Sequence, residues 1–147
     1  MVYVTGHREL FDEISGMWEQ QKLHHCNKST YFSSIFESIT FEERKETLLE
    51  KSRDGELSII IAKDKELYVG YCLSVAVKGN GSIESLFVLP EYRKQGVARS
   101  LVEKSLYWLS EKKCNKITLE VAVGNDEVLL FYEKFGFYPY EIILMRK

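Results

Sequence analysis

The order in which two hydrophobic periodicities follow one another along the chain constrains its fold more than any single motif. In the first third, apolar residues recur at spacings of three and four. This spacing predicts a helix over residues 9–24 and a second helical stretch over 32–51. The second stretch is interrupted at Thr40, whose spacing from Glu43 is that of a capping box and predicts a new helix start.

Three strands are expected in the middle of the chain. The β-branched and apolar runs over residues 57–62, 67–77 and 82–89 are separated by short turn signals, so they predict an antiparallel meander. Pro90 stops the third of these strands, because proline cannot donate a backbone hydrogen bond to a sheet.

Helices and strands then alternate to the end of the chain. The later predicted elements are a helix over 97–112, a strand over 116–123, a helix that begins at Asn125 and ends at Gly136, and a strand over 138–146. Helices, a meander and then strand–helix–strand–helix–strand predict a three-layer α/β sandwich with a mixed sheet. With 147 residues, we expect a single domain over residues 1–147.

Charge and cysteine content exclude several classes of protein. The 20 basic and 22 acidic side chains give a net charge of −2, which argues against a dedicated nucleic-acid binder. Three scattered cysteines without a CxxC pair indicate neither a disulfide framework nor a zinc ribbon. We interpret His24, His25 and Cys26 as surface side chains, since consecutive helix residues point about 100° apart and cannot close one metal site. Without a signal-peptide core or a membrane-length apolar run, we expect a cytoplasmic protein with neither a membrane nor a nucleic-acid partner.

The turn before the helix at 97–112 has the composition of an anion site. Arg93, Gly96 and Ala98 fit the pattern Arg/Gln-x-x-Gly-x-Gly/Ala, and the backbone N–H groups at a helix N-terminus are unpaired. Gly96 and the small Ala98 allow a phosphate to approach the backbone, and Arg93 can add a charge-assisted bond. The alternative is an ordinary strand–turn–helix connection in which the glycine serves tight packing. Neither the Rossmann nor the P-loop glycine pattern is present.

Residues 82–137 resemble the core of the GNAT superfamily of N-acetyltransferases. The motifs that carry the resemblance are Leu86, Val88 and Pro90, then Arg93, Gly96 and Ala98, then Asn125, and finally Phe131, Tyr132, Gly136 and Phe137. They cover a little over a third of the chain. The resemblance implies acetyl-coenzyme A as co-substrate, no metal, and a mostly antiparallel sheet that is splayed between its fourth and fifth strands.

The same resemblance implies the positions that contact the coenzyme. The backbone amides from Gln95 to Ser100 would hold its pyrophosphate, the backbone at Phe87 and Val88 would pair with the pantetheine arm, and Asn125 would touch that arm. The implied contact residues are Phe87, Val88, Arg93, Lys94, Gln95, Gly96, Val97, Ala98, Arg99, Ser100 and Asn125. One departure is Val128, where the family commonly has alanine.

Two carboxylates and one phenol are candidates for proton transfer. In a regular strand Glu84 would share an otherwise apolar face with Leu86 and Val88, which makes it the first choice of general base. The alternative is an exposed or salt-bridged strand residue. Glu120 is the second choice, and its alternative is a solvated side chain. Tyr132 lies on the apolar stripe of its predicted helix, and this position indicates a core residue. The resemblance instead implies that its hydroxyl protonates the departing thiolate.

The acceptor is expected to be an amine, on a small molecule or on a peptide. Tyr31 and Phe32, with the acidic residues Glu37, Glu42 and Glu43 nearby, would suit a cationic amine, although a solvated helix face also explains them. We therefore expect an acetyl-coenzyme A-dependent N-acetyltransferase that works by direct attack, as a monomer or a homodimer. Two alternatives stay open: an acyl-coenzyme A-binding sensor without turnover, and an acetyltransferase of protein lysines or N-termini.

Overall fold

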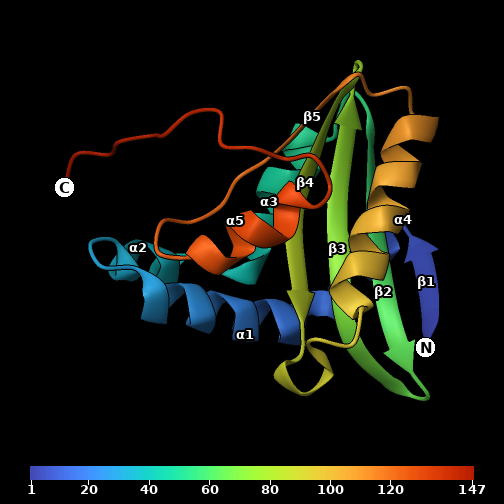
Figure 1. Cartoon of the computed structure of the whole chain (residues 1–147), viewed down its shortest axis with the longest axis horizontal. Coiled ribbons are helices and arrows are strands. Elements are labelled where there is room, and N and C mark those ends of the chain that lie inside the picture. Colours follow the sequence, from blue (N-terminus) through green and yellow to red (C-terminus); the bar gives the residue numbers. More distant parts are fainter.

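A computed structural model describes residues 1–147 and is built around one five-stranded sheet in the order β1-β2-β3-β4-β5 (Figure 1). Strands β2 (Glu56–Asp64), β3 (Leu67–Val77) and β4 (Asn80–Val88) form the expected antiparallel meander. Strand β5 (Lys116–Leu119) lies parallel to β4, so the sheet is mixed. The predicted fold class, a three-layer α/β sandwich, is confirmed.

The first strand, β1 (Val2–Gly6), was missing from the sequence prediction. It pairs antiparallel with β2 at one edge of the sheet. Alternation over five residues is too short a signal to separate an edge strand from an irregular N-terminus. Its existence shows that the chain enters the sheet before its first helix.

Two layers of helices cover the sheet. Side chains of α1 (Phe11–Lys28) and α3 (Phe41–Lys51) pack on one face against Ile59 and Ile61 of β2. Helix α4 (Val97–Glu111) covers the other face against Ile60 and Ala62. The period of two along β2 therefore sends alternate residues into the two cores.

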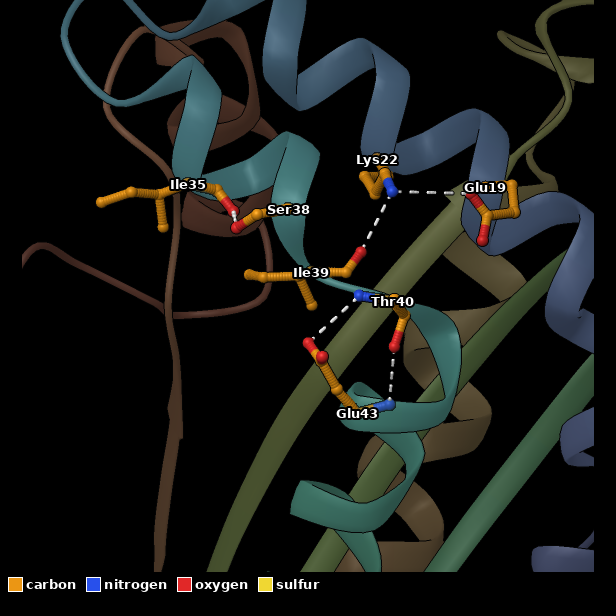
Figure 2. Close-up of polar contacts among 7 residues, drawn as sticks. All are labelled: Glu19, Lys22, Ile35, Ser38, Ile39, Thr40 and Glu43. Atoms are coloured by element: carbon orange, nitrogen blue, oxygen red, sulfur yellow. Dashed lines mark hydrogen bonds and ion pairs between the residues drawn. The ribbon is translucent and has the colours of Figure 1, made fainter.

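The predicted interruption of the second helical stretch is present between α2 (Ser33–Ser38) and α3. Figure 2 shows the capping box that starts α3: Glu43 N–H donates to Thr40 Oγ1 at 3.1 Å, and Thr40 N–H donates to Glu43 Oε2 at 3.3 Å. Lys22 Nζ of α1 donates to Ile39 O at 3.0 Å. These contacts fix the α2–α3 connection against α1.

The C-terminal part differs from the sequence prediction. The strand expected over 116–123 is paired only as β5, and the helix that follows, α5 (Asp126–Glu133), ends three residues before Gly136. No strand forms over 138–146, and no residue from 138 to 147 takes part in a backbone hydrogen bond. A strand needs a neighbouring strand to pair with as well as the right sequence periodicity. Residues 138–146 have no such neighbour. None of the helices is both long enough and apolar enough to cross a lipid bilayer.

Candidate functional site

The candidate site is a cleft of about 340 Å³ between α1, β4, the turn before α4, the end of β5 and α5. It is where the sheet opens. Residues 80–83 of β4 pair with residues 116–119 of β5, and beyond Ile83 and Leu119 the two strands are no longer paired. The candidate residues that line the cleft are Glu84, Phe87, Val88, Arg93, Ala98, Glu120, Asn125 and Tyr132.

A β-bulge at Glu84 explains why the strands separate there. Ser74 of β3 lies opposite Ile83, but Leu73 lies opposite Ser85, so Glu84 has no residue across from it. A bulge bends its strand and increases the local twist. The bend begins where pairing with β5 ends, and it leaves one edge of β4 free to face the cleft. The expectation that Glu84 sits in a regular strand was therefore wrong.

The Glu84 side chain is held at the wall of the cleft. Lys51 Nζ, at the end of α3, lies 2.7 Å from Glu84 Oε1, and the Glu84 side chain is 12% exposed. Arg44 Nη2 donates to the backbone oxygen of Glu84 at 3.1 Å, which satisfies a carbonyl that the bulge takes out of the sheet. The salt-bridged alternative is thus real, and the same carboxylate also lines the cleft.

Gln21 of α1 joins the helix to the free edge of β4. Its Nε2 donates to Leu86 O at 3.1 Å, and its Oε1 accepts from the hydroxyl of Ser85 at 2.9 Å and from that of Tyr71. Burial raises the pKa of the Tyr71 hydroxyl, so this group stays a donor. These three hydrogen bonds position α1 against β4.

The β4 backbone presents Val88 to the cleft. Leu89 N–H donates to Val69 O of β3 at 2.8 Å, and donors alternate sides along an antiparallel strand. The N–H of Val88 therefore points away from β3, while that of Phe87 points toward it. Arg93 Nε donates to Val88 O at 2.9 Å, and the guanidinium carbon lies 5.5 Å from the Phe87 ring centroid. Of the Val88 backbone groups, the N–H therefore remains for a ligand, since the carbonyl accepts from Arg93.

The turn before α4 leaves a row of amides unpaired. Lys94 and Gly96 have positive φ angles of 61° and 83°, and Gly96 precedes the first residue of α4. None of the backbone N–H groups of residues 94–99 donates a hydrogen bond within the protein. Such a row of amides at the positive end of a helix dipole is an anion site.

Two of the expected anion contacts are used by the protein itself. Ser100 N–H donates to Gly96 O at 3.0 Å in the first turn of α4, so its amide is not available. The Arg99 guanidinium pairs with Glu103 along the helix at 2.9 Å. Within the expected row from Gln95 to Ser100, the amides of residues 95–99 are unpaired, and so is that of Lys94.

Tyr132 of α5 is both a core residue and a residue of the cleft wall. Its ring is buried in the α4-side core and packs edge-on against Phe131 and Phe137, with centroids 5.2 Å and 5.9 Å away. The residue also lines the cleft, and no protein group hydrogen-bonds its hydroxyl. Burial raises the pKa of that hydroxyl, which therefore stays protonated at neutral pH.

Asn125 and Glu120 also lie in the wall of the cleft. Asn125 precedes α5 as expected, but its side chain makes no capping hydrogen bond. The amide is therefore free for a ligand. Glu120 follows the last paired residue of β5 and is exposed.

Tyr31 and Phe32 are not brought to the cleft. Tyr31 is exposed between α1 and α2, and neither aromatic is among the cleft residues. Glu43, expected near an acceptor, is used in the capping box. An acceptor site at Tyr31 and Phe32 would therefore lie outside this cleft, and it stays a prediction.

Helix α1 supplies cleft residues that the sequence analysis did not identify. Gln21, His24, His25 and Lys28 line the cleft, although His24 and His25 were interpreted as surface side chains. Burial lowers the pKa of both histidines, and the charges of Lys28 and Arg93 lower that of His24 further. Positions 21, 24/25 and 28 lie on one helix face, and this polar stripe is the signal that could have identified them.

Comparisons with known proteins agree with this arrangement. The sequence model described as the acetyltransferase (GNAT) family matches residues 18–137. N-alpha-acetyltransferase 30 of Schizosaccharomyces pombe is 33% identical over 86 residues, which are 55% of this chain and 57% of that protein. Aminoglycoside N(6')-acetyltransferase type 1 of Acinetobacter baumannii is 31% identical over 65 residues, 44% of each chain. The chain thus spans about half the length of these curated relatives.

Solved structures show the same fold. The ribosomal-protein-alanine N-acetyltransferase of Brucella melitensis biovar Abortus 2308 superposes with a TM-score of 0.69 at 14% identity, covering all of both chains. At this identity the likeness concerns the arrangement of the chain alone.

Proposed function

The chain belongs to the acetyltransferase (GNAT) family, and from this membership we propose that it is an acetyl-coenzyme A-dependent N-acetyltransferase. The acceptor is a primary amine that attacks directly, without an acetylated enzyme residue. The observation that carries the proposal is the row of free amides at residues 94–99, which adjoins the cleft of Glu84 and Tyr132 through Arg93 and Ala98.

The residues of the turn fit a coenzyme A diphosphate. Their N–H groups have no partner in the protein, and a Cβ built on Gly96 meets no atom within 4 Å. The turn therefore has both donors and open space for phosphate oxygens. Asn125 and the free edge of β4 would contact the pantetheine arm. When bound, acetyl-coenzyme A supplies an acetyl thioester with a good leaving group.

The side chains of the cleft would move the protons. A lysine-like amine has a pKa near 10.4, so presenting it neutral at pH 7 costs roughly 4.6 kcal/mol. Glu84 would accept that proton directly or through water, with Glu120 as the second candidate. Tyr132, protonated because it is buried, would donate a proton at the thiolate sulfur. The N–H of Val88 would stabilise the developing charge on the carbonyl oxygen.

The cleft offers acidic side chains to a cationic acceptor. Glu84, Glu120 and Glu127 line it beside the basic Lys28 and Arg93, and the two histidines of α1 are neutral at pH 7 because burial lowers their pKa. Two of the relatives are named as an N-alpha-acetyltransferase and an aminoglycoside N(6')-acetyltransferase, and both names describe transfer of an acetyl group to nitrogen. We extend only this shared chemistry to the present chain.

The proposal is tested by release of free coenzyme A thiol from acetyl-coenzyme A in the presence of an amine panel. The panel contains polyamines, aminoglycosides, amino acids and peptides with free N-termini. We expect thiol release that depends on an amine, with equimolar acetylated amine found by mass spectrometry. Binding of coenzyme A without release for any amine would instead support a non-catalytic sensor.

Gly96→Ala is expected to weaken coenzyme A binding about tenfold, equivalent to roughly 1.4 kcal/mol. At a φ of 83° a Cβ is strained, and it would occupy the open face of the turn. Titration calorimetry with coenzyme A measures the effect.

The matched control is Gly79→Ala. Gly79 has a φ of 81° in the β3–β4 turn, at the other end of β4. Both variants lose roughly 1–2 kcal/mol of stability from the same backbone strain. Equal losses of coenzyme affinity in the two variants would show that the effect is global and not local to residue 96.

A further inference from the structure

The free edge of β4 carries backbone oxygens that side chains of other elements already cover. Because Leu89 N–H donates to Val69 O of β3, the N–H and C=O groups of residues 86 and 88 face the opposite edge. β5 does not pair with β4 there. The covered oxygens and their donors are Glu84 O with Arg44 at 3.1 Å, Leu86 O with Gln21 at 3.1 Å, and Val88 O with Arg93 at 2.9 Å. The edge therefore offers N–H donors to a ligand, whereas its carbonyl oxygens are occupied.

Gln21 covers the middle oxygen with an amide group whose orientation is fixed. The hydroxyls of Tyr71 and Ser85 both bond to its Oε1, so its Nε2 is the end that meets Leu86 O. Tyr71 is fully buried, and Ser85 directly follows the bulge. Gln21 thus contacts two successive residues of β4, between the proposed base and the proposed oxyanion donor.

An uncovered carbonyl oxygen at this place would oppose the reaction. A hydrogen bond from an ammonium group to a carbonyl oxygen favours the charged form of the amine and raises its pKa. The attacking amine must be neutral, and Glu84 is the group proposed to take its proton. Leu86 and Glu84 both line the cleft. If the oxygen of Leu86 were uncovered, it would compete with the carboxylate of Glu84 for the N–H groups of the bound amine.

We propose that Gln21 is a positioning residue for acetyl transfer to the amine. Through Leu86 it removes a competing acceptor, and through Ser85 it holds the edge of β4 against α1. The inference rests on the proposed function and extends it to a residue outside the family motifs. Gln21 itself contacts neither the acetyl thioester nor the proton that moves.

Gln21→Met tests this role, because methionine has the same length and neither an N–H donor nor an oxygen. The hydroxyls of Tyr71 and Ser85 lie 2.7 Å apart and can pair with each other, so the variant should fold, which circular dichroism checks. We expect kcat to fall about tenfold at pH 7 and the kcat–pH profile to move up by about one pH unit. The Kd for coenzyme A should change less than about twofold.

The matched control is Gln20→Met, at the exposed neighbour on α1 that does not line the cleft. It should leave kcat and the pH profile unchanged. The charged and titratable groups around the edge are kept in both variants. They are the two histidines and Lys28 of α1, Arg44 and Lys51 of α3, Glu84, Arg93, and the acids and the tyrosine that line the cleft from β5 and α5. The series runs from about pH 7 to pH 10, where the histidines stay neutral.

Gln21→Glu is the second variant, since its carboxylate keeps an oxygen for the two hydroxyls and has no N–H for Leu86 O. It should move the profile up at least as far as Gln21→Met. A loss of kcat by one constant factor at every pH, or no loss, would overturn the inference while amine-dependent thiol release by the unmodified protein upheld the proposed function. Absence of thiol release by the unmodified protein with every amine would overturn both.

Discussion

Tyr132→Phe is expected to lower kcat about 100-fold, while the Kd for coenzyme A changes less than about twofold. The substitution keeps the ring that packs against Phe131 and Phe137 and removes only the hydroxyl. That hydroxyl has no partner in the protein, so its loss leaves no buried group unsatisfied. Stopped-flow or steady-state thiol release, together with calorimetry, separates the two constants.

The pH dependence of the unmodified protein gives a second readout for Tyr132. Burial raises the pKa of the hydroxyl above its usual value near 10, so the protonated form persists into alkaline solution. No fall in kcat from tyrosine ionisation is therefore expected up to about pH 10. Tyr107→Phe, at an exposed tyrosine of α4, is the matched control. An unchanged kcat in Tyr132→Phe would remove the phenol from the mechanism.

Glu84→Gln is expected to lower kcat/KM for the amine about 100-fold at pH 7. The loss should shrink as the pH rises toward the amine pKa near 10.4, because the neutral amine then forms without a base. Lys51 would lose its 2.7 Å partner, but it is half exposed and can be solvated. Thiol release at subsaturating amine, measured over a series of pH values, gives the ratio of kcat/KM between the unmodified protein and Glu84→Gln.

The control for Glu84 is Glu46→Gln, an exposed carboxylate of α3 that does not line the cleft. It should leave kcat/KM unchanged at every pH. If Glu84→Gln lowered kcat/KM by the same factor at pH 7 and at pH 10, the cause would be a changed structure at the bulge rather than a lost proton transfer. In that case Glu120 becomes the carboxylate to replace.

Local chemistry explains which parts of the fold were predictable. Thr40 and Glu43 satisfy each other's backbone groups within four residues, and Gly96 precedes its helix by one, so both features are complete in the sequence. The three meander strands are long and strongly apolar. The layered fold followed from the order of these elements.

The features that the sequence did not predict depend on contacts between distant segments. The bulge at Glu84 is defined by its register against Leu73 and Ser74, and no glycine marks it. Gln21 reaches the cleft only because α1 crosses β4, 65 residues further along the chain at Leu86. Strand-like sequence at residues 138–146 could not show which edge, if any, it meets.

The most direct measurement for the whole account is amide hydrogen exchange of residues 94–99 with and without coenzyme A. These N–H groups have no acceptor in the protein, so we expect fast exchange alone and strong protection in the complex. Exchange in the β3–β4 turn at Gly79 should not change. If coenzyme A bound and residues 94–99 still exchanged at their free rate, the diphosphate would lie elsewhere and the proposed site would be wrong.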